Sequence, residues 1–387
     1  MGDPSTTGQS AWSVRLWGYL ADPNRGWVSL LYSDAQISGI DGDETIGPYR
    51  LTPLAAAADH QPGQLRPVLE LASWFRHPDQ QPAASGSANW TGLSIHQEVA
   101  ALASLVLGIR LRGNDPSPRY QQQDGSITTY EVAAQVVPSA PSSPWSSPIL
   151  PGLADSTADL GPLRPYLESL PRLAAHHTVQ LVRAARQYAD ALWIAEGDPE
   201  LAWLMLVSAV EVAAAAHQAT TEDYTLLVKD AFPLSAKALV ATGGEERLAE
   251  AAATEFDSLI KSTVRFLAFA RDFRPDPPDG RTVDPDGQLP WSWGKMRKAL
   301  STVYRLRSHR LHAGIAFPWP LLIPPPAASD GLPAEVFTQD THGSGDTTWL
   351  AAELPMTLAV FAYLVRSMLL RWWTTLTEGA VRPDMSG

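Results

Sequence analysis

The sequence predicts a mainly α-helical protein that begins with a small mixed α/β domain. Beyond residue 160, apolar residues recur at helical spacing almost throughout. Before residue 137, short β-branched and aromatic runs are interspersed with helical patterns. Between the two parts, the segment 138–151 is rich in proline, which blocks both helix and sheet pairing. We therefore expect an N-terminal α/β domain at 1–137, a linker at 138–159 and a helical domain at 160–380.

Composition narrows the class of protein. The 387 residues are enough for two domains, and 45% hydrophobic with 18% charged residues is typical of a folded chain. Because the chain has no cysteine, disulfides, thiolate metal sites and cysteine nucleophiles are excluded. No secretory signal and no membrane span is visible, so we expect a cytoplasmic protein that needs no cofactor.

In the N-terminal domain, the clearest element is a helix at 94–112, where apolar residues from Val99 to Val106 follow near-helical spacing. The run Trp-Val-Ser-Leu-Leu-Tyr at 27–32 predicts a strand. The other expected elements are a strand at 12–17, a helix at 64–75, a polar turn region at 113–125 and a strand at 127–137.

The helical domain has clear start and stop signals. Asp198-Pro199 predicts a capping residue followed by proline in the first helical turn, so a helix should run from 200 to about 217. Gly243-Gly244 predicts a helix break. Further helices are expected at 164–197 (one or two), 223–242, 245–271, 293–313 and 348–378, with proline-rich loops at 274–290 and 318–333.

One basic window interrupts an otherwise acidic chain. The net charge of −12 argues against non-specific coating of nucleic acid, which depends on neutralising phosphates. Between Gly287 and Ser329, however, there is no acidic residue at all. Trp291 and Trp293 in this window either stack on bases or simply anchor the start of a helix. The candidate phosphate-binding residues of the window are Lys295, Arg297, Lys298, Arg305, His309 and Arg310.

Within the window, Arg307 and His312 form an Arg-x4-His unit near the end of the helix expected at 293–313. A cation that holds a phosphate and an imidazole that moves a proton suffice for RNA cleavage without a metal. Five residues place the two side chains about 140° apart on a helix, whereas Ser308 shares the face of His312. Gly314 is expected to be a left-handed cap. The alternative is a helix end that carries basic residues because its dipole favours them.

Glu211 is the one charged residue between Leu201 and Ala216, in an apolar helix that predicts a buried position. A buried carboxylate needs a partner, and the arginines at 305–310 are the candidates. The alternative places Glu211 on a solvent-facing line. His176-His177 has no further ligand at metal-binding spacing, so we expect a surface or core pair and no metal site. Phosphate-loop and nucleophile-elbow motifs are absent.

Together, the two segments resemble the HEPN superfamily, and within it the Apea-like HEPN domains. The segment Leu-Val-Ser-Ala-Val-Glu-Val-Ala-Ala matches the family's apolar helix with an embedded Glu, here Glu211. Residues 304–314, Tyr-Arg-Leu-Arg-Ser-His-Arg-Leu-His-Ala-Gly, match Tyr-x-x-Arg-[Asn/Ser/Asp]-x-x-x-His-[Gly/Ala]-Gly. Ala313 is a mild departure, since Gly-Gly or Gly-Lys is commoner there. The likeness covers about residues 160–380.

The resemblance implies a helical bundle that forms a homodimer and brings two Arg-x4-His motifs into one cleft. It implies a metal-independent endoribonuclease acting as a toxin or in phage defence, with an antitoxin or a phage-derived activator as partner. Arg307, Ser308, His312 and Glu211 are then the expected catalytic residues, and RNA the substrate. Other members of the family are inactive and bind a nucleotide or a protein, which is the alternative for this chain.

Overall fold

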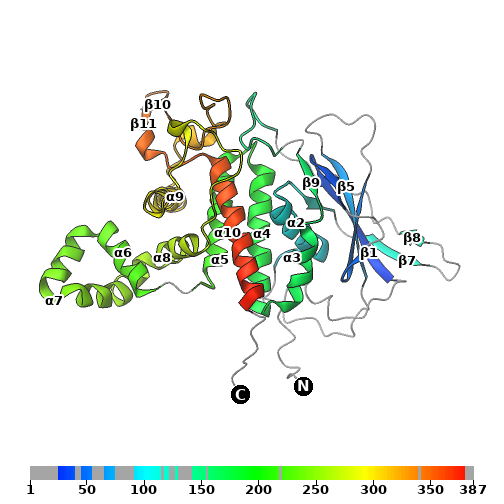
Figure 1. The fold of residues 1–387 in the computed structure, drawn as a ribbon, viewed down its shortest axis with the longest axis horizontal. Coiled ribbons are helices and arrows are strands. Elements are labelled where there is room, and N and C mark those ends of the chain that lie inside the picture. The colour runs from blue at the N-terminus through cyan, green and yellow to red at the C-terminus, as the bar shows by residue number, and fades with distance from the viewer. Residues whose placement is uncertain are drawn as a thin grey trace, which may run out of the picture. The chain divides into compact units, whose positions relative to one another are not determined.

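The structure is a computed structural model, and the chain in it forms two compact units. One unit is Met1–Ala202 with Leu370–Gly387, and the other is Trp203–Leu369. These units differ from the domains expected from sequence, whose limits stay a prediction. The expected mainly helical fold with a small N-terminal sheet is confirmed (Figure 1). The residues that the structure describes are 25–39, 45–54, 65–74, 91–114, 117–121, 127–129, 142–153, 156–217, 220–338 and 341–379.

The first unit contains an antiparallel sheet in the order β3-β4-β5-β1-β7-β8, with β6 also pairing with β1. A short parallel pair joins β2 (Gln36–Ser38) to β9 (Thr157–Asp159). The strands of the main sheet are β1 (Arg25–Ser33), β3 (Thr45–Ile46), β4 (Tyr49–Pro53), β5 (Arg66–Trp74), β6 (Arg112–Gly113), β7 (Ser117–Gln121) and β8 (Ile127–Thr129).

The helix expected at 64–75 is wrong, because this segment is the strand β5. It pairs with β1 on one side and β4 on the other. Its residues Val68, Leu69, Leu71 and Ala72 are all buried, and a continuous apolar run does not distinguish a central strand from a helix. Pro67 is tolerated there because it lies beside the register shift in β1.

Other expectations for the first unit have mixed outcomes. The strand at 27–32 is confirmed as β1, whereas the polar turn expected at 113–125 contains the strand β7. The strand expected at 12–17 lies outside the described residues, as does the end of the one expected at 127–137. The helix expected at 94–112 is confirmed as α2 (Ile95–Leu107) for most of its length, but it ends at the left-handed Gly108, and Arg112 belongs to the strand β6.

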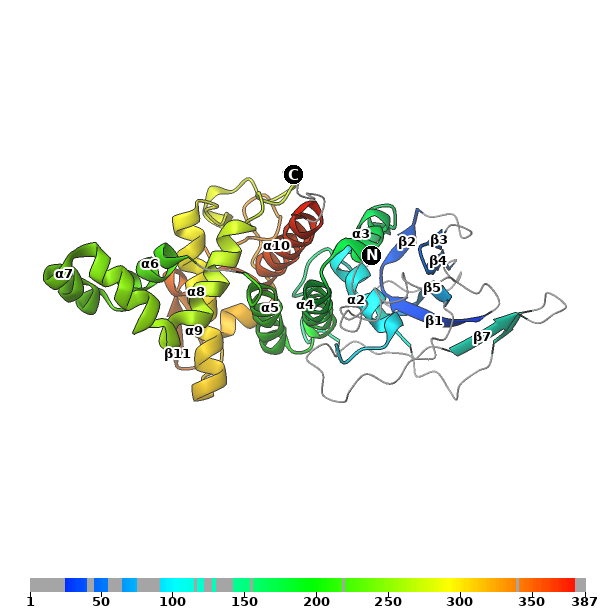
Figure 2. The ribbon, with the colours of Figure 1, turned by 90° about the horizontal axis from the view of Figure 1, so that it is seen from below.

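The helices of the first unit lie on one side of its sheet. In both views α2 lies between the sheet and α4 (Figures 1 and 2). Ser94 and Gln97 form a capping box at the start of α2, and Gly108 ends it with φ 71°. The remaining helices are α3 (Leu163–Ser169), η3 (Leu170–Arg172) and α4 (Ala175–Ile194), joined by the end of α10, whose Trp373 indole donates to the Ser169 hydroxyl.

Part of the expected linker is packed against the first unit. Ile149 and Leu150 are buried, and their backbone N–H groups donate to the two carboxylate oxygens of Glu196 at 2.9 and 3.1 Å. The buried carboxylate thus satisfies backbone donors that the prolines of this segment leave without sheet partners.

The second unit is built from helices around Trp203. This residue is fully buried, stacks on Phe361 at 4.9 Å and on Phe317 at 6.0 Å, and donates its indole N–H to the Leu321 carbonyl. The helices are α5 (Pro199–Ala214), α6 (Thr221–Ala231), α7 (Pro233–Thr254), α8 (Asp257–Asp272), α9 (Trp293–Ala313) and α10 (Leu358–Gly379), with short elements η4 (Pro285–Gly287), η5 (Trp319–Leu322), β10 (Thr341–Ser344), β11 (Thr347–Leu350) and η6 (Ala351–Glu353).

Several helix limits in this region were predictable. α5 begins at Pro199, and the Asp198 carboxylate accepts from the Leu201 N–H as expected of a cap. The break at Gly243-Gly244 is confirmed as a kink in α7, with φ 70° at Gly244. The helix expected at 348–378 begins only at Leu358, because β11 and η6 precede it and Pro355 disfavours a continuous helix.

Among the described helices, none has the length and apolar character that crossing a bilayer requires. Within the same residues, no group of three or more His, Asp or Glu side chains is arranged to hold a metal ion.

Candidate functional site

The helix α9 carries most of the predicted site, and its limits agree with the sequence. Met296, Ala299, Leu300, Val303 and Tyr304 form its buried face. Gly314 ends the helix with φ 69° and ψ 9°, and its N–H donates to the His309 carbonyl. This left-handed cap was expected, and it places His312 in the last turn.

Arg307 of α9 meets Glu211 of α5. The Arg307 Nη2 donates to Glu211 Oε2 at 2.7 Å, and the Tyr304 hydroxyl donates to Glu211 Oε1, also at 2.7 Å. Both partners of the ion pair are partly buried, with side-chain exposures of 20% and 21%. The prediction that an arginine of the 305–310 segment pairs with Glu211 is therefore confirmed.

Tyr304 holds the centre of this arrangement. Its ring packs on Phe266 at 5.1 Å, and the Arg307 guanidinium lies 5.7 Å from the ring centre. Burial, followed by the hydrogen bond to Glu211 and its negative charge, raises the pKa of the Tyr304 phenol well above its usual value of 10. The phenol is therefore a permanent donor that orients the Glu211 carboxylate at neutral pH.

The ion pair does not use the whole guanidinium. Arg307 Nε is buried and has no hydrogen-bond partner among the described residues. The arginine guanidinium is planar and carries five N–H donors on three nitrogens. Because Glu211 binds only Nη2, the donors on the other two nitrogens are not used by the ion pair. Arg307 can thus be oriented by Glu211 and still offer Nη1 to an anion, whereas the buried Nε is not accessible.

His312 lies on a different side of α9. It is exposed, as are Arg305 and His309, whereas Arg307 faces α5. No hydrogen bond between Ser308 and His312 is present in the described part of the chain, although the two lie one turn apart on α9. Within one copy, the structure unites Glu211, Tyr304 and Arg307 and leaves His312 apart, consistent with the 140° separation.

The six predicted phosphate-binding residues fall into two groups. Lys295, Lys298, Arg305 and His309 are exposed, and none of them has an ion pair in the described residues. Arg297 instead pairs with Asp230 of α6, and its side chain is only 21% exposed. Arg310 is half-buried. Arg297 is therefore the weakest of these candidates, because a carboxylate already neutralises it.

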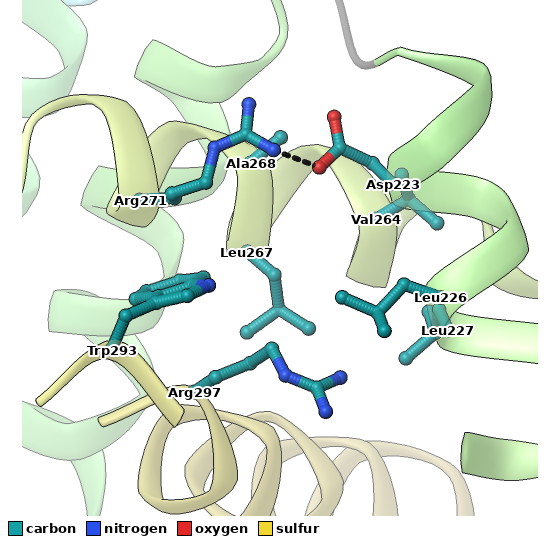
Figure 3. A pocket seen from close by; sticks show the side chains of 9 residues that line it. All are labelled: Asp223, Leu226, Leu227, Val264, Leu267, Ala268, Arg271, Trp293 and Arg297. Carbon is teal, nitrogen blue, oxygen red and sulfur yellow. Dashed lines mark hydrogen bonds and ion pairs between the residues drawn. The ribbon is translucent and has the colours of Figure 1, made fainter. Parts of the chain in front are cut away.

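Arg297 also lines a shallow, open pocket between α6, α8 and α9 (Figure 3). Its floor is aliphatic, and Trp293 forms one side. Asp223 and Arg271 form an ion pair at its rim, and Arg271 also pairs with Asp272. The tryptophan thus helps to form a pocket in which each arginine is already paired with an aspartate.

The two histidines of α4 pack against each other. The rings of His176 and His177 lie 3.9 Å apart, and Trp372 contacts His177 edge-on. Burial, and then the neighbouring His176, lowers the pKa of His177 from its usual value. The pair is a surface feature of the first unit, as expected.

Sequence reasoning missed two contributors to this region. Tyr304 appeared in the motif without a role, although a tyrosine three residues before an arginine shares its helix face and signals a common partner. Asp230 carries no comparable signal, because nothing local to α6 indicates that it faces Arg297.

Comparisons with protein-family models, curated proteins and solved structures find no match for this chain.

Proposed function

We propose that the protein is a metal-independent endoribonuclease of the HEPN type that acts as a homodimer. The observation that supports this best is the contact between the two motif-bearing helices. Glu211 of α5 and Arg307 of α9 form an ion pair, and Tyr304 fixes the carboxylate between them. The three residues come from the two segments on which the resemblance rests, so their contact supports the proposal.

The proposed reaction needs only groups of this chain. The ribose 2′-oxygen attacks the adjacent phosphorus, and the bond from phosphorus to the 5′-oxygen breaks. The 2′-oxygen loses a proton and the departing 5′-oxygen gains one, with His312 as the group that transfers it. Arg307 stabilises the charge on the phosphate in the transition state. The products are a 2′,3′-cyclic phosphate end and a 5′-hydroxyl end.

The proposal requires two copies because the two reagents diverge in one. Arg307 faces α5, whereas His312 is exposed at the end of the same helix. Leu311 and Ile315 beside it are also exposed, at 53% and 57%, and apolar side chains of this size favour burial against another chain. A two-fold axis near the end of α9 would bring Arg307 of one copy towards His312 of the other.

The first test compares cleavage of single-stranded RNA by wild type and by His312→Ala and Arg307→Ala. Assays contain EDTA, and the product ends are identified. Each substitution should lower the rate by about 10²–10³-fold, the usual effect of removing a transition-state contact. His176→Ala and Arg172→Ala remove exposed residues of the same types elsewhere and should retain activity. Undiminished cleavage by His312→Ala protein would overturn the assignment.

A second candidate function is an inactive member of the same kind that binds a nucleotide or a protein partner. Two observations favour it: Glu211 neutralises Arg307, and the net charge is −12. Under this alternative, purified protein would bind a mononucleotide or a partner saturably and show no turnover of RNA. Calorimetric titration of the wild type together with the cleavage assay separates the two candidates.

The cellular role is proposed on the resemblance alone. A toxin or defence nuclease would slow growth when it is expressed without its antitoxin or in the presence of an activator. His312→Ala protein, expressed to the same level, should leave growth unchanged.

A further inference from the structure

One face of α9 carries a row of six polar side chains over most of its length, and five of them are basic. Successive members are three or four residues apart, so they lie on the same side of the helix. At 100° per residue, the row occupies an arc of about 100°. The row, called here the α9 basic face, consists of Lys295, Lys298, Thr302, Arg305, His309 and His312.

The α9 basic face points away from the core. The buried residues of α9 are centred about 150° from it around the helix axis, at 100° per residue. Apart from the half-buried Thr302, every member of the row is exposed. The row is therefore available to a ligand along its whole length in a single copy.

The cationic side chains of α9 differ in whether they form ion pairs. Arg297 and Arg307, which lie off the row, are paired with Asp230 and Glu211. Lys295, Lys298 and Arg305, which lie on it, have no ion pair among the described residues, and α9 itself contains no acidic residue. Unpaired cations that share one face attract a polyanion and release its counterions on binding.

We propose that the α9 basic face binds the phosphates of single-stranded RNA and leads the strand to His312. This rests on the proposed ribonuclease function and specifies its substrate. Steps of three or four residues advance about 4.5 or 6 Å along the axis, and the row spans about 25 Å from Lys295 to His312. The row is one side chain wide, which suits one strand of several nucleotides, whereas duplex RNA is held across two successive grooves.

The test measures binding of a fluorescent single-stranded RNA decamer that is 2′-O-methylated throughout and therefore lacks the attacking hydroxyl. Anisotropy titrations at several KCl concentrations give the dependence of log K on log[salt]. A triple variant, Lys295→Gln/Lys298→Gln/Arg305→Gln, should lower the magnitude of this slope by about 2, since each single-strand phosphate contact contributes about 0.7. The matched control, Arg172→Gln/Lys237→Gln/Lys261→Gln, changes the net charge equally at exposed residues outside α9 and should leave the slope unchanged.

An unchanged slope in the α9 triple variant would overturn the proposal. Equally tight, row-dependent binding of a blunt RNA duplex would overturn the assignment to single strands. Because the probe resists 2′-hydroxyl attack, this result is independent of cleavage. If the triple substitution weakens binding but the wild type does not cleave ordinary RNA, only the proposed ribonuclease function is contradicted. If the wild type cleaves RNA and the triple substitution leaves cleavage unaffected, only the proposed role of the α9 basic face is contradicted.

Discussion

At the scale of single residues, Glu211 is the position on which most depends. It accepts from both Tyr304 and Arg307, so one carboxylate connects α5 to α9. The same carboxylate keeps Arg307 in one orientation and leaves part of its guanidinium available. Replacing the Glu211 carboxylate should therefore lower both the stability of the protein and its rate of RNA cleavage.

Glu211→Gln should lower the free energy of unfolding by about 1–2 kcal/mol, because Arg307 would lose its partly buried charged partner. It should also slow RNA cleavage, since the guanidinium is no longer fixed. Urea denaturation and the cleavage assay measure the two effects. Glu246→Gln on the exposed surface of α7 is the control and should change stability by less than about 0.5 kcal/mol. Equal stability of wild type and Glu211→Gln would mean that the ion pair contributes little.

The raised pKa of the Tyr304 phenol predicts a dependence of stability on alkaline pH. Above pH 10 the unfolded chain releases this proton while the folded chain keeps it. The contribution is therefore complete below pH 10 and is lost as pH rises towards the folded-state pKa. Tyr304→Phe should flatten the fall in unfolding free energy between pH 9 and 11, measured by urea denaturation. Identical slopes for the two proteins would contradict the burial-driven shift.

At the scale of elements, α9 was predictable because its signals are local. Apolar residues at helical spacing, a basic last turn and Gly314 define its limits. The pairing of Glu211 with the 305–310 segment was also predictable, since a lone charge on an apolar helix needs a partner. The strand β5 was not, because burial on both faces removes the alternation that identifies a strand.

The end of α9 can be tested through its glycines. Gly314→Ala should lower the free energy of unfolding by about 1 kcal/mol, because alanine is strained at φ 69° although there is space for its methyl group. Gly294→Ala, in the first turn of the same helix and equally free of clashes, should raise it by about 0.5–1 kcal/mol. Thermal unfolding measures both effects. If both substitutions changed the stability in the same direction, the left-handed cap at Gly314 would be contradicted.

At the scale of the whole molecule, sequence patterns predicted a mainly helical chain with a small N-terminal sheet but not its two compact units. The limits of these units fall inside α5 and α10, at Ala202 and Leu370, where the helical pattern is unbroken. The partners of Arg297 and Arg271 were likewise not predictable, because they depend on how α6 packs against α8 and α9. The proposed dimer belongs to this scale too, since one copy keeps Arg307 and His312 apart.

The most direct test of the proposed site mixes two inactive proteins. Arg307→Ala and His312→Ala proteins are combined, allowed to exchange subunits, and assayed for cleavage of single-stranded RNA in EDTA. If Arg307 of one copy works with His312 of the other, half of the dimers are mixed and each has one intact site, so roughly a quarter of wild-type activity should return. A mixture as inactive as its two components, beside an active wild type, would contradict the shared site.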